Sequence, residues 1–280
     1  MHVTRRRHRE PVSYHLLCDA LTLRDTSESA LLVHAIQRVV SGLVTHDHYA
    51  NAAQSAAGEL SSTKVKQQLA IAIAVDANPI AALFPPTVRA EDFESRWNAL
   101  NEAAHFGVKT CLENFGTDAE EVSRISATGE RDELFRAEMM SHFLELLSGG
   151  HRANVVDDGR AILTLSANLE PAASAIHEVL ELLYAEPGIG IEQCAIQVGA
   201  SLRTLQRQLA RHGLLFAQLK QAVRITIAGY RMRNCDESLT TTAQVAGFFD
   251  SAHMIHAWQT ACGISPSTYR SIAKLSVHAR

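Results

Sequence analysis

Seven basic side chains fall within residues 201–233, a segment in which no Asp or Glu occurs. A guanidinium group pairs with guanine or with phosphate, and an ammonium group neutralises phosphate as a point charge. A basic run usually forms only a solvated surface, but one that lacks every compensating carboxylate is typical of a polyanion-binding site. The pattern therefore indicates nucleic-acid binding by this group: Arg203, Arg207, Arg211, Lys220, Arg224, Arg231 and Arg233.

A helix, a tight turn and a second helix are predicted between residues 190 and 213, and they would position the first of these side chains. Ala195 is small enough for two helices to cross closely, and Gly199 can adopt the positive φ that a sharp turn requires. Ser201 is placed to cap the second helix. Leu202, Leu205 and Leu209 are expected to anchor that helix to the core. The opposite face then carries Arg203, Thr204, Gln206, Arg207 and Arg211.

The same pattern recurs 48 residues later, with Ala243 in place of Ala195 and Gly247 in place of Gly199. Met254 and Trp258 supply apolar anchors four residues apart. Between the two units, residues 216–234 have helix-forming composition throughout. A helix of about 18 residues spans about 27 Å and could hold two recognition helices about one DNA turn apart.

These features resemble the DNA-binding domain of the AraC/XylS family of transcriptional regulators. The resemblance covers residues 171–270, and it includes the stretches LRTLQRQLARHG, LFAQLKQAVR and AGFFDSAHMIHAWQTACGISPSTYR. It ends in a signature formed by Gly263, Ser265, Pro266, Tyr269 and Arg270. A bacterial, sequence-specific DNA-binding regulator that reads two adjacent major-groove segments is what the resemblance implies.

The resemblance also implies which side chains contact DNA. Arg203, Gln206 and Arg207 would lie at the major groove, with Ser201, Arg211, Lys220 and Arg224 available to phosphates. The second recognition helix would present Ser251, Ala252, His253, His256 and Gln259.

The second unit departs from the family pattern in its charge. Arg is usual where His256 stands, and residues 234–269 contain no Lys or Arg but do contain Asp236, Glu237 and Asp250. Neutral histidine attracts phosphate weakly. We therefore expect the first unit to supply most of the affinity, and the second to contribute weakly or through DNA shape.

The N-terminal part of the chain reads as helical. Apolar residues make up 46% of the sequence and aromatic residues only 6%, which favours a helical globular protein over a β-sandwich. Apolar periodicity predicts helices at 29–44, 65–76, 93–112 and 134–147, and prolines predict a loop at 77–88. The pair Asp158-Gly159, between β-prone runs at 153–156 and 161–165, predicts a single β-hairpin.

We therefore expect a mainly α protein with two domains. Residues 1–167 would form a helix-rich sensing or dimerisation domain with one hairpin. Residues 168–280 would form a double helix-turn-helix domain joined by a long linker helix.

Several other classes of protein are disfavoured. The five cysteines are widely spaced and form no CxxC pair, which argues against a disulfide framework or a zinc knuckle. No apolar run reaches membrane-spanning length and no secretory signal is present, so we expect a cytoplasmic protein. We find no catalytic motif, and we expect no cofactor, no metal site and no enzymatic activity. His46-Asp47-His48 is interpreted as a polar helix end, not as a metal site.

Double-stranded promoter DNA is the expected partner. Contact with RNA polymerase, a small-molecule effector and a homodimer enter only as what the resemblance implies. Two alternatives remain open: a protein-binding regulator that has lost productive DNA binding, and an enzyme domain fused to a DNA-binding module.

Overall fold

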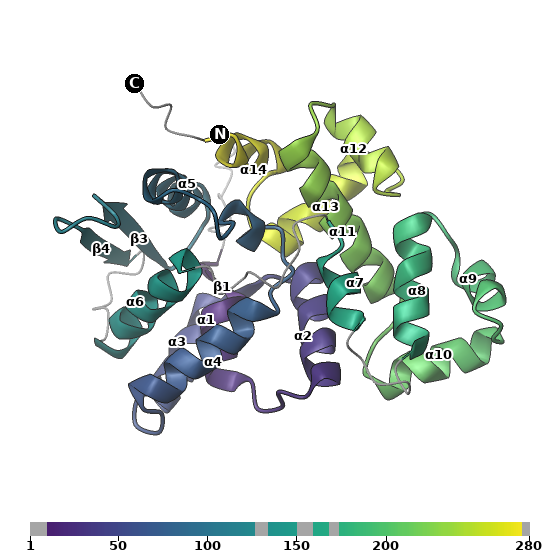
Figure 1. Ribbon diagram of the computed structural model, residues 1–280, viewed down its shortest axis with the longest axis horizontal. Coiled ribbons are helices and arrows are strands. Elements are labelled where there is room, and N and C mark those ends of the chain that lie inside the picture. The colour runs from purple at the N-terminus through teal and green to yellow at the C-terminus, as the bar shows by residue number, and fades with distance from the viewer. Residues whose placement is uncertain (1–9, 127–133, 150–158, 168–173, 276–280) are drawn as a thin grey trace, which may run out of the picture.

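The computed structural model describes residues 10–126, 134–149, 159–167 and 174–275. Within them the chain is mainly helical, with two small two-stranded antiparallel sheets, so the predicted fold class is confirmed (Figure 1). No helix among these residues is long and apolar enough to span a membrane.

The N-terminal elements form a helical cluster with both sheets at its edges. Helix α1 packs on α3 and α4, α4 packs on α6, and α5 packs on β3. In order, the elements are β1 (Val12–Tyr14), α1 (His15–Thr22), α2 (Glu28–Val40), β2 (Leu43–Thr45), α3 (His46–Ala56), α4 (Ser62–Ala74), the 3-10 helix η1 (Ala81–Leu83), α5 (Ala90–Ala103), β3 (Val108–Glu113), β4 (Glu121–Ser126), α6 (Leu134–Ser148) and α7 (Ala161–Ser166).

The C-terminal elements are all helical and follow the predicted order of two short helix pairs around one long helix. They are α8 (Ser174–Ala185), α9 (Ile191–Gln197), α10 (Leu202–Arg211), α11 (Phe216–Asn234), α12 (Leu239–Val245), α13 (Ser251–Cys262) and α14 (Pro266–Ala273).

Two predicted helices end earlier than expected because their last apolar residues belong to strands. Helix α2 ends at Val40, and Leu43 and Val44 pair with Tyr14 and Ser13 in the sheet β1–β2. Helix α5 ends at Ala103, and residues 108–113 form β3, paired with β4. Residues four apart share a face in a strand as well as in a helix, because four is a multiple of the strand period of two.

The predicted hairpin around residue 159 is wrong. Residues 153–156 lie outside the described residues, and residues 161–166 form helix α7 instead of a strand. Ala161 and Ile162 are buried, and α7 packs between α2 and α8. The apolar side chains of this short run lie on the face of α7 that packs against its neighbours. This tertiary packing overrides their β propensity.

One continuous core joins the N-terminal and C-terminal elements, with buried side chains from Leu16 to Ile272 in a single cluster. Helix α2 packs on α11 and α13, and α5 packs on α14. The predicted domain junction near residue 168 lies outside the described residues, so the division into 1–167 and 168–280 stays a prediction.

Candidate nucleic-acid interface

The first helix-turn-helix unit consists of α9, a turn and α10. Gly199 in the turn has a φ of +68°, and the amide of Ala200 donates to the carbonyl of Ala195 at 2.9 Å. The side-chain oxygen of Ser201 accepts a hydrogen bond from the amide of Thr204 at 3.2 Å, so Ser201 caps α10 as predicted. The sequence pattern thus identified the turn and the start of the recognition helix correctly.

Two of the three predicted anchors hold α10 to the core. Leu205 and Leu209 are buried, whereas Leu202 is 36% exposed, so its prediction as an anchor is wrong. Leu202 is the first residue of α10, and helical side chains lean toward the helix N-terminus. Its side chain therefore extends beyond the end of the helix and away from the core.

The outer face of α10 is cationic and open. Arg203, Gln206, Arg207 and Arg211 are exposed, while Thr204 is half-buried with its hydroxyl 2.9 Å from that of Ser201. Within residues 10–126, 134–149, 159–167 and 174–275, none of the three guanidinium groups has a hydrogen-bond or ion-pair partner. These groups are therefore available to an external anion.

Lys220 and Arg224 on α11 are engaged within the protein. The Lys220 ammonium donates to the carbonyls of Gly188 and Ile189 at 2.9 and 2.6 Å, and Arg224 donates through Nε to the carbonyl of Pro187 at 3.2 Å. Burial lowers the pKa of both groups, and the charge of Arg224 lowers that of Lys220 further. Both side chains thus hold the loop between α8 and α9 against α11.

The second unit repeats the backbone plan with α12, a turn at Gly247 and α13. Gly247 has a φ of +78°, and the Asp250 carboxylate caps α13 by accepting from the amide of His253 at 2.7 Å. Met254 and Trp258 are fully buried, as their predicted role as anchors requires. The outward side of α13 carries the exposed residues Ala252, His253, His256 and Gln259, with Ser251 half-buried.

The cations that flank the second unit are committed to protein partners. Arg231 forms a two-point ion pair with Glu237, and Arg233 donates to the Tyr269 hydroxyl at 2.6 Å. Arg270 donates to the carbonyl of Glu237 at 2.8 Å. The outer face of α13 therefore receives no free cation from these neighbours.

The turn of the second unit closely approaches the backbone of the α8–α9 loop, which precedes the first unit. A Cβ atom at Gly247 would lie 2.7 Å from the Pro187 carbonyl carbon, so only glycine fits there. Helix α11, at 19 residues, is about 28 Å long at 1.5 Å per residue, close to the length expected from sequence. The turn of the second unit, the α8–α9 loop of the first and the linker helix thus form one packed body.

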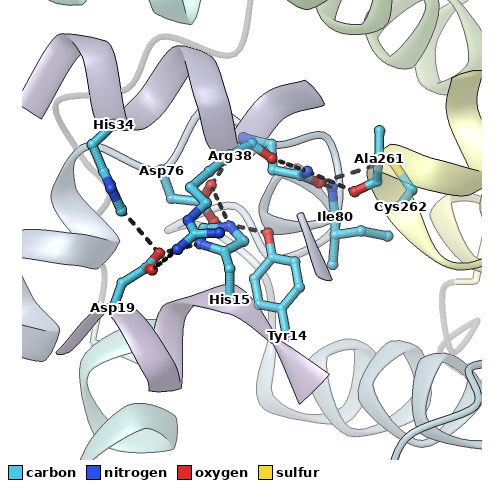
Figure 2. A network of polar contacts seen from close by, with 10 residues as sticks. Tyr14, His15, Asp19, His34, Arg38, Asp76, Ile80, Ala261 and Cys262 are labelled. Carbon is cyan, nitrogen blue, oxygen red and sulfur yellow. Dashed lines mark hydrogen bonds and ion pairs between the residues drawn. The ribbon is translucent and has the colours of Figure 1, made fainter. Parts of the chain in front are cut away.

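The N-terminal elements hold the second unit at the end of its recognition helix (Figure 2). The carbonyl of Ala261, in the last turn of α13, accepts from the Gly42 amide at 3.1 Å and from the Asn78 side chain at 3.0 Å. The Tyr269 hydroxyl donates to the carbonyl of Pro79 at 2.9 Å. The first unit has a smaller attachment: α9 and α10 lie at the outer edge of the molecule in Figure 1, and the His212 ring at the end of α10 lies 3.3 Å from the Ser29 hydroxyl of α2.

A buried ionic network supports this attachment, and sequence reasoning missed it. Asp19 of α1 accepts from His15 at 2.6 Å, from His34 at 2.9 Å and from Arg38 at 2.6 Å. On the other side of the ring, His15 Nε2 lies 3.4 Å from Asp76 Oδ1, and the Asp76 carboxylate accepts from the backbone amide of Asn78 at 2.9 Å. The i, i+4 spacing of His15 and Asp19 was the available signal, but the other partners are distant in sequence.

A protonated His15 places a positive charge between the carboxylates of Asp19 and Asp76. Burial alone lowers the pKa of His15, but the Asp76 carboxylate and the hydrogen bond to Asp19 outweigh it and raise the pKa to about 8. Burial alone raises the pKa of Asp19, but hydrogen bonds from His15 and His34 hold it well below its usual range. Protonated His15 and Arg38 thus face the carboxylates of Asp19 and Asp76. The ligand atoms of His15, Asp19 and His34 also converge closely enough to be considered as a metal site, but their 2.6 and 2.9 Å separations are those of direct hydrogen bonds.

The N-terminal part also contains an apolar cavity of about 60 Å³. Trp97 and Phe106 line it, together with Tyr14, while Arg124 and His46 supply polar groups. His46 is buried and lies 3.0 Å from the Ser13 hydroxyl, whereas His48 is exposed on the same helix, so the two side chains do not converge.

One family model matches the C-terminal helices. Residues 194–272 match the family model described as "Helix-turn-helix domain". No match was found among curated proteins. Two crystal structures of ToxT from Vibrio cholerae resemble parts of the chain. The first, from strain O395, is 14% identical, with 48% of this chain and 57% of that chain covered and a TM-score of 0.35. The second, in a P21 crystal form, is 15% identical, with 53% and 51% covered and a TM-score of 0.33.

The chain thus spans only about half the length of the ToxT structures that it matches. The family match covers α10 to α13 entirely and most of α9 and α14. Residues 194–272 therefore form a helix-turn-helix domain.

Proposed function

We propose that this protein is a transcriptional regulator that binds promoter DNA through both helix-turn-helix units. The observation that carries the proposal is the outer face of α10. There the guanidinium groups of Arg203, Arg207 and Arg211 are exposed beside Gln206, and no hydrogen bond or ion pair within the described residues engages them. This face belongs to residues 194–272, which match the helix-turn-helix family model. A DNA duplex is the polyanion whose major groove accepts a helix of this width.

In the proposed complex, α10 enters the major groove. Arg203 and Arg207 pair with guanine, Gln206 pairs with adenine, and Arg211 neutralises a phosphate. Ser201 and Thr204, at the start of α10, are placed beside the backbone phosphates. Helix α13 enters the next major-groove segment with Ser251, Ala252, His253, His256 and Gln259.

Lys220 and Arg224 have a smaller role in this proposal than their charge suggests. Both already donate to carbonyls of residues 187–189, so a phosphate would have to share them with the protein. We assign them chiefly to positioning the α8–α9 loop, and through it the first unit, relative to the linker helix.

The N-terminal part is proposed to sense or to dimerise. Its apolar cavity, about 60 Å³ in this structure, is the candidate effector site, and it would have to widen to admit more than a few atoms. The contacts of the N-terminal part with α13 are the route by which such a change would reach the second recognition helix. Contact with RNA polymerase and assembly as a homodimer are further proposals that follow from the AraC-type domain.

Genomic footprinting with the purified full-length protein tests the proposal. We expect discrete protected sites for the wild type and none for a variant in which Arg203, Gln206 and Arg207 are all replaced by alanine. A Lys64→Ala, Gln67→Ala variant is the control, because both side chains are exposed on α4. No protection by the wild type would overturn the proposal and favour the protein-binding alternative, which the neutral face of α13 motivates.

The enzyme alternative has its own measurement. The titratable groups of the His15 network bond one another and the lining of the cavity is mainly apolar, so catalysis has no evident open site among the described residues. A substrate-dependent activity that disappears on changing His15 or Asp19 would support that alternative.

A further inference from the structure

Phe249 is a large apolar side chain at an unusual place. It is 89% exposed, although its neighbour Phe248 is buried with its ring 5.3 Å from that of His253. On its other side, Asp250 caps α13. The backbone is thus fixed on both sides of Phe249, and the exposed ring stands immediately before the first turn of the second recognition helix.

The surface next to Phe249 on α13 carries no Lys or Arg. Ala252, His253, His256 and Gln259 are exposed along α13, and the sequence from 234 to 269 holds no Lys or Arg. Asp250 adds a negative charge at the same end of the helix. A surface of this kind gains little from phosphate neutralisation, so its affinity for DNA must come from contacts with base edges.

The major groove presents one apolar group, the 5-methyl group of thymine, which Ala and Phe side chains contact. The N-terminal residues of a recognition helix are the ones that approach base edges. We propose that Phe249, with Ala252 beside it, packs against thymine methyl groups, so that the second unit reads an A·T segment by apolar contact. This inference rests on the proposed DNA-binding function.

DNA is a better occupant for this ring than a protein partner. The ring adjoins the helix that the backbone plan and the family match identify as a DNA reader. The contact also explains how a recognition helix without cations can discriminate between sequences. The apolar contact requires no cation. The Asp250 carboxylate beside it caps α13 by accepting from the backbone amide of His253 at 2.7 Å.

The test begins with selection of binding sites for the full-length protein from a random duplex library. Each thymine in the half-site covered by α13 is then replaced in turn by deoxyuridine, which removes only the methyl group. We expect one replacement to weaken wild-type binding about fourfold, the effect of one buried methyl group. We expect Phe249→Ala to weaken binding to the unmodified site by a similar or larger factor, and to abolish the effect of that deoxyuridine.

Two variants make the result decisive. Phe249→Leu keeps an apolar side chain and should retain the sensitivity to deoxyuridine. Ile125→Ala removes another exposed apolar side chain, on β4, and should bind like the wild type. The inference is overturned if Phe249→Ala binds the selected site with wild-type affinity, as a protein-docking role would give, or if its deoxyuridine penalty persists. If the wild type selects no sequence at all, the proposed DNA-binding function itself fails.

Discussion

The two helix-turn-helix units share a backbone plan and differ in charge and attachment. The first presents free arginines at the edge of the molecule, and the second presents histidines, an alanine and a glutamine. The second is also held by the N-terminal part at the last turn of its recognition helix. The comparison teaches that one unit is suited to supply affinity, whereas the other is suited to respond to the rest of the protein.

The largest expected effect tests the charge difference directly. Replacing Arg203, Gln206 and Arg207 together by alanine should weaken binding to a selected operator at least about 100-fold, because each bidentate base contact contributes about 1–3 kcal/mol. The matched change in the second unit, with Ala252 kept and His256 and Gln259 replaced by alanine, should weaken it much less. Binding isotherms at one salt concentration measure both. Equal losses would show that the units contribute alike.

The next effect tests the attachment of the second unit. Asn78 is fully buried, and its side chain donates to the carbonyls of Arg38 and Ala261. Asn78→Ala should lower the free energy of unfolding by about 2–3 kcal/mol, because buried groups lose their partners. It should also reduce DNase protection of the half-site bound by α13 more than that of the other.

Asn98→Ala is the matched control for that experiment. Asn98 also exchanges two hydrogen bonds with the backbone of a single residue, Leu112 on β3, and within the described part of the chain it has no hydrogen bond to a C-terminal helix. It should destabilise the protein and leave the two half-sites equally protected. Unequal protection in this variant would mean that loss of stability, not loss of attachment, causes the effect.

A pH dependence of stability should follow from the network behind Asn78. The folded pKa of His15, about 8, lies above its ordinary value of 6.5, so its contribution is complete below pH 6.5 and is lost as the pH rises through 8. The loss amounts to about 2 kcal/mol. Tyr14, Asp19 and Asp76 face the ring, and His34 and Arg38 bond to Asp19 on its other side.

Urea unfolding at several pH values from 6 to 9 measures the contribution of His15 to the free energy of unfolding. His15→Gln keeps a hydrogen-bonding side chain and should flatten the dependence in that window. An unchanged slope in the variant would assign the titration to another group.

The smallest expected effect separates Arg207, Lys220 and His256 by their surroundings. Arg207→Ala should reduce the slope of log K against log salt by about 1, because one phosphate or base contact is lost. Lys220→Ala should reduce it less, since that ammonium group already donates to two carbonyls. His256→Ala at pH 8 should leave it unchanged. A larger change for Lys220 than for Arg207 would reverse our assignment of the two groups.

Sequence reasoning identified the C-terminal helices well because their signals are local. The glycine turns, the Ser201 cap and the four-residue spacing of Met254 and Trp258 each act over a few residues. The same locality explains the failures. Strands β1 and β2 pair across about 30 residues, and helix α7 is fixed by contacts with α2 and α8. The residues of these segments alone therefore do not determine their secondary structure.

The surroundings of the site residues were less predictable than their identity. Lys220 and Arg224 carry the expected charge, but their partners, the carbonyls of residues 187–189, become neighbours only after the chain has folded. The Asp19 network joins α1, α2 and the segment after α4, and no short motif encodes it. Residue type therefore indicated which groups could bind DNA, and tertiary packing decides which of them are free to do so.

The contact of Gly247 with Pro187 restricts what the operator can look like. The turn of the second unit packs against the loop that precedes the first unit. We therefore expect the two recognition helices to keep one relative position, so that they cannot both follow a displaced half-site. One extra base pair between the half-sites turns the second by about 35° and moves it by about 3.4 Å along the duplex. The protein should therefore accept a single length of intervening sequence, and variation among its natural targets should appear in the bases and not in their separation.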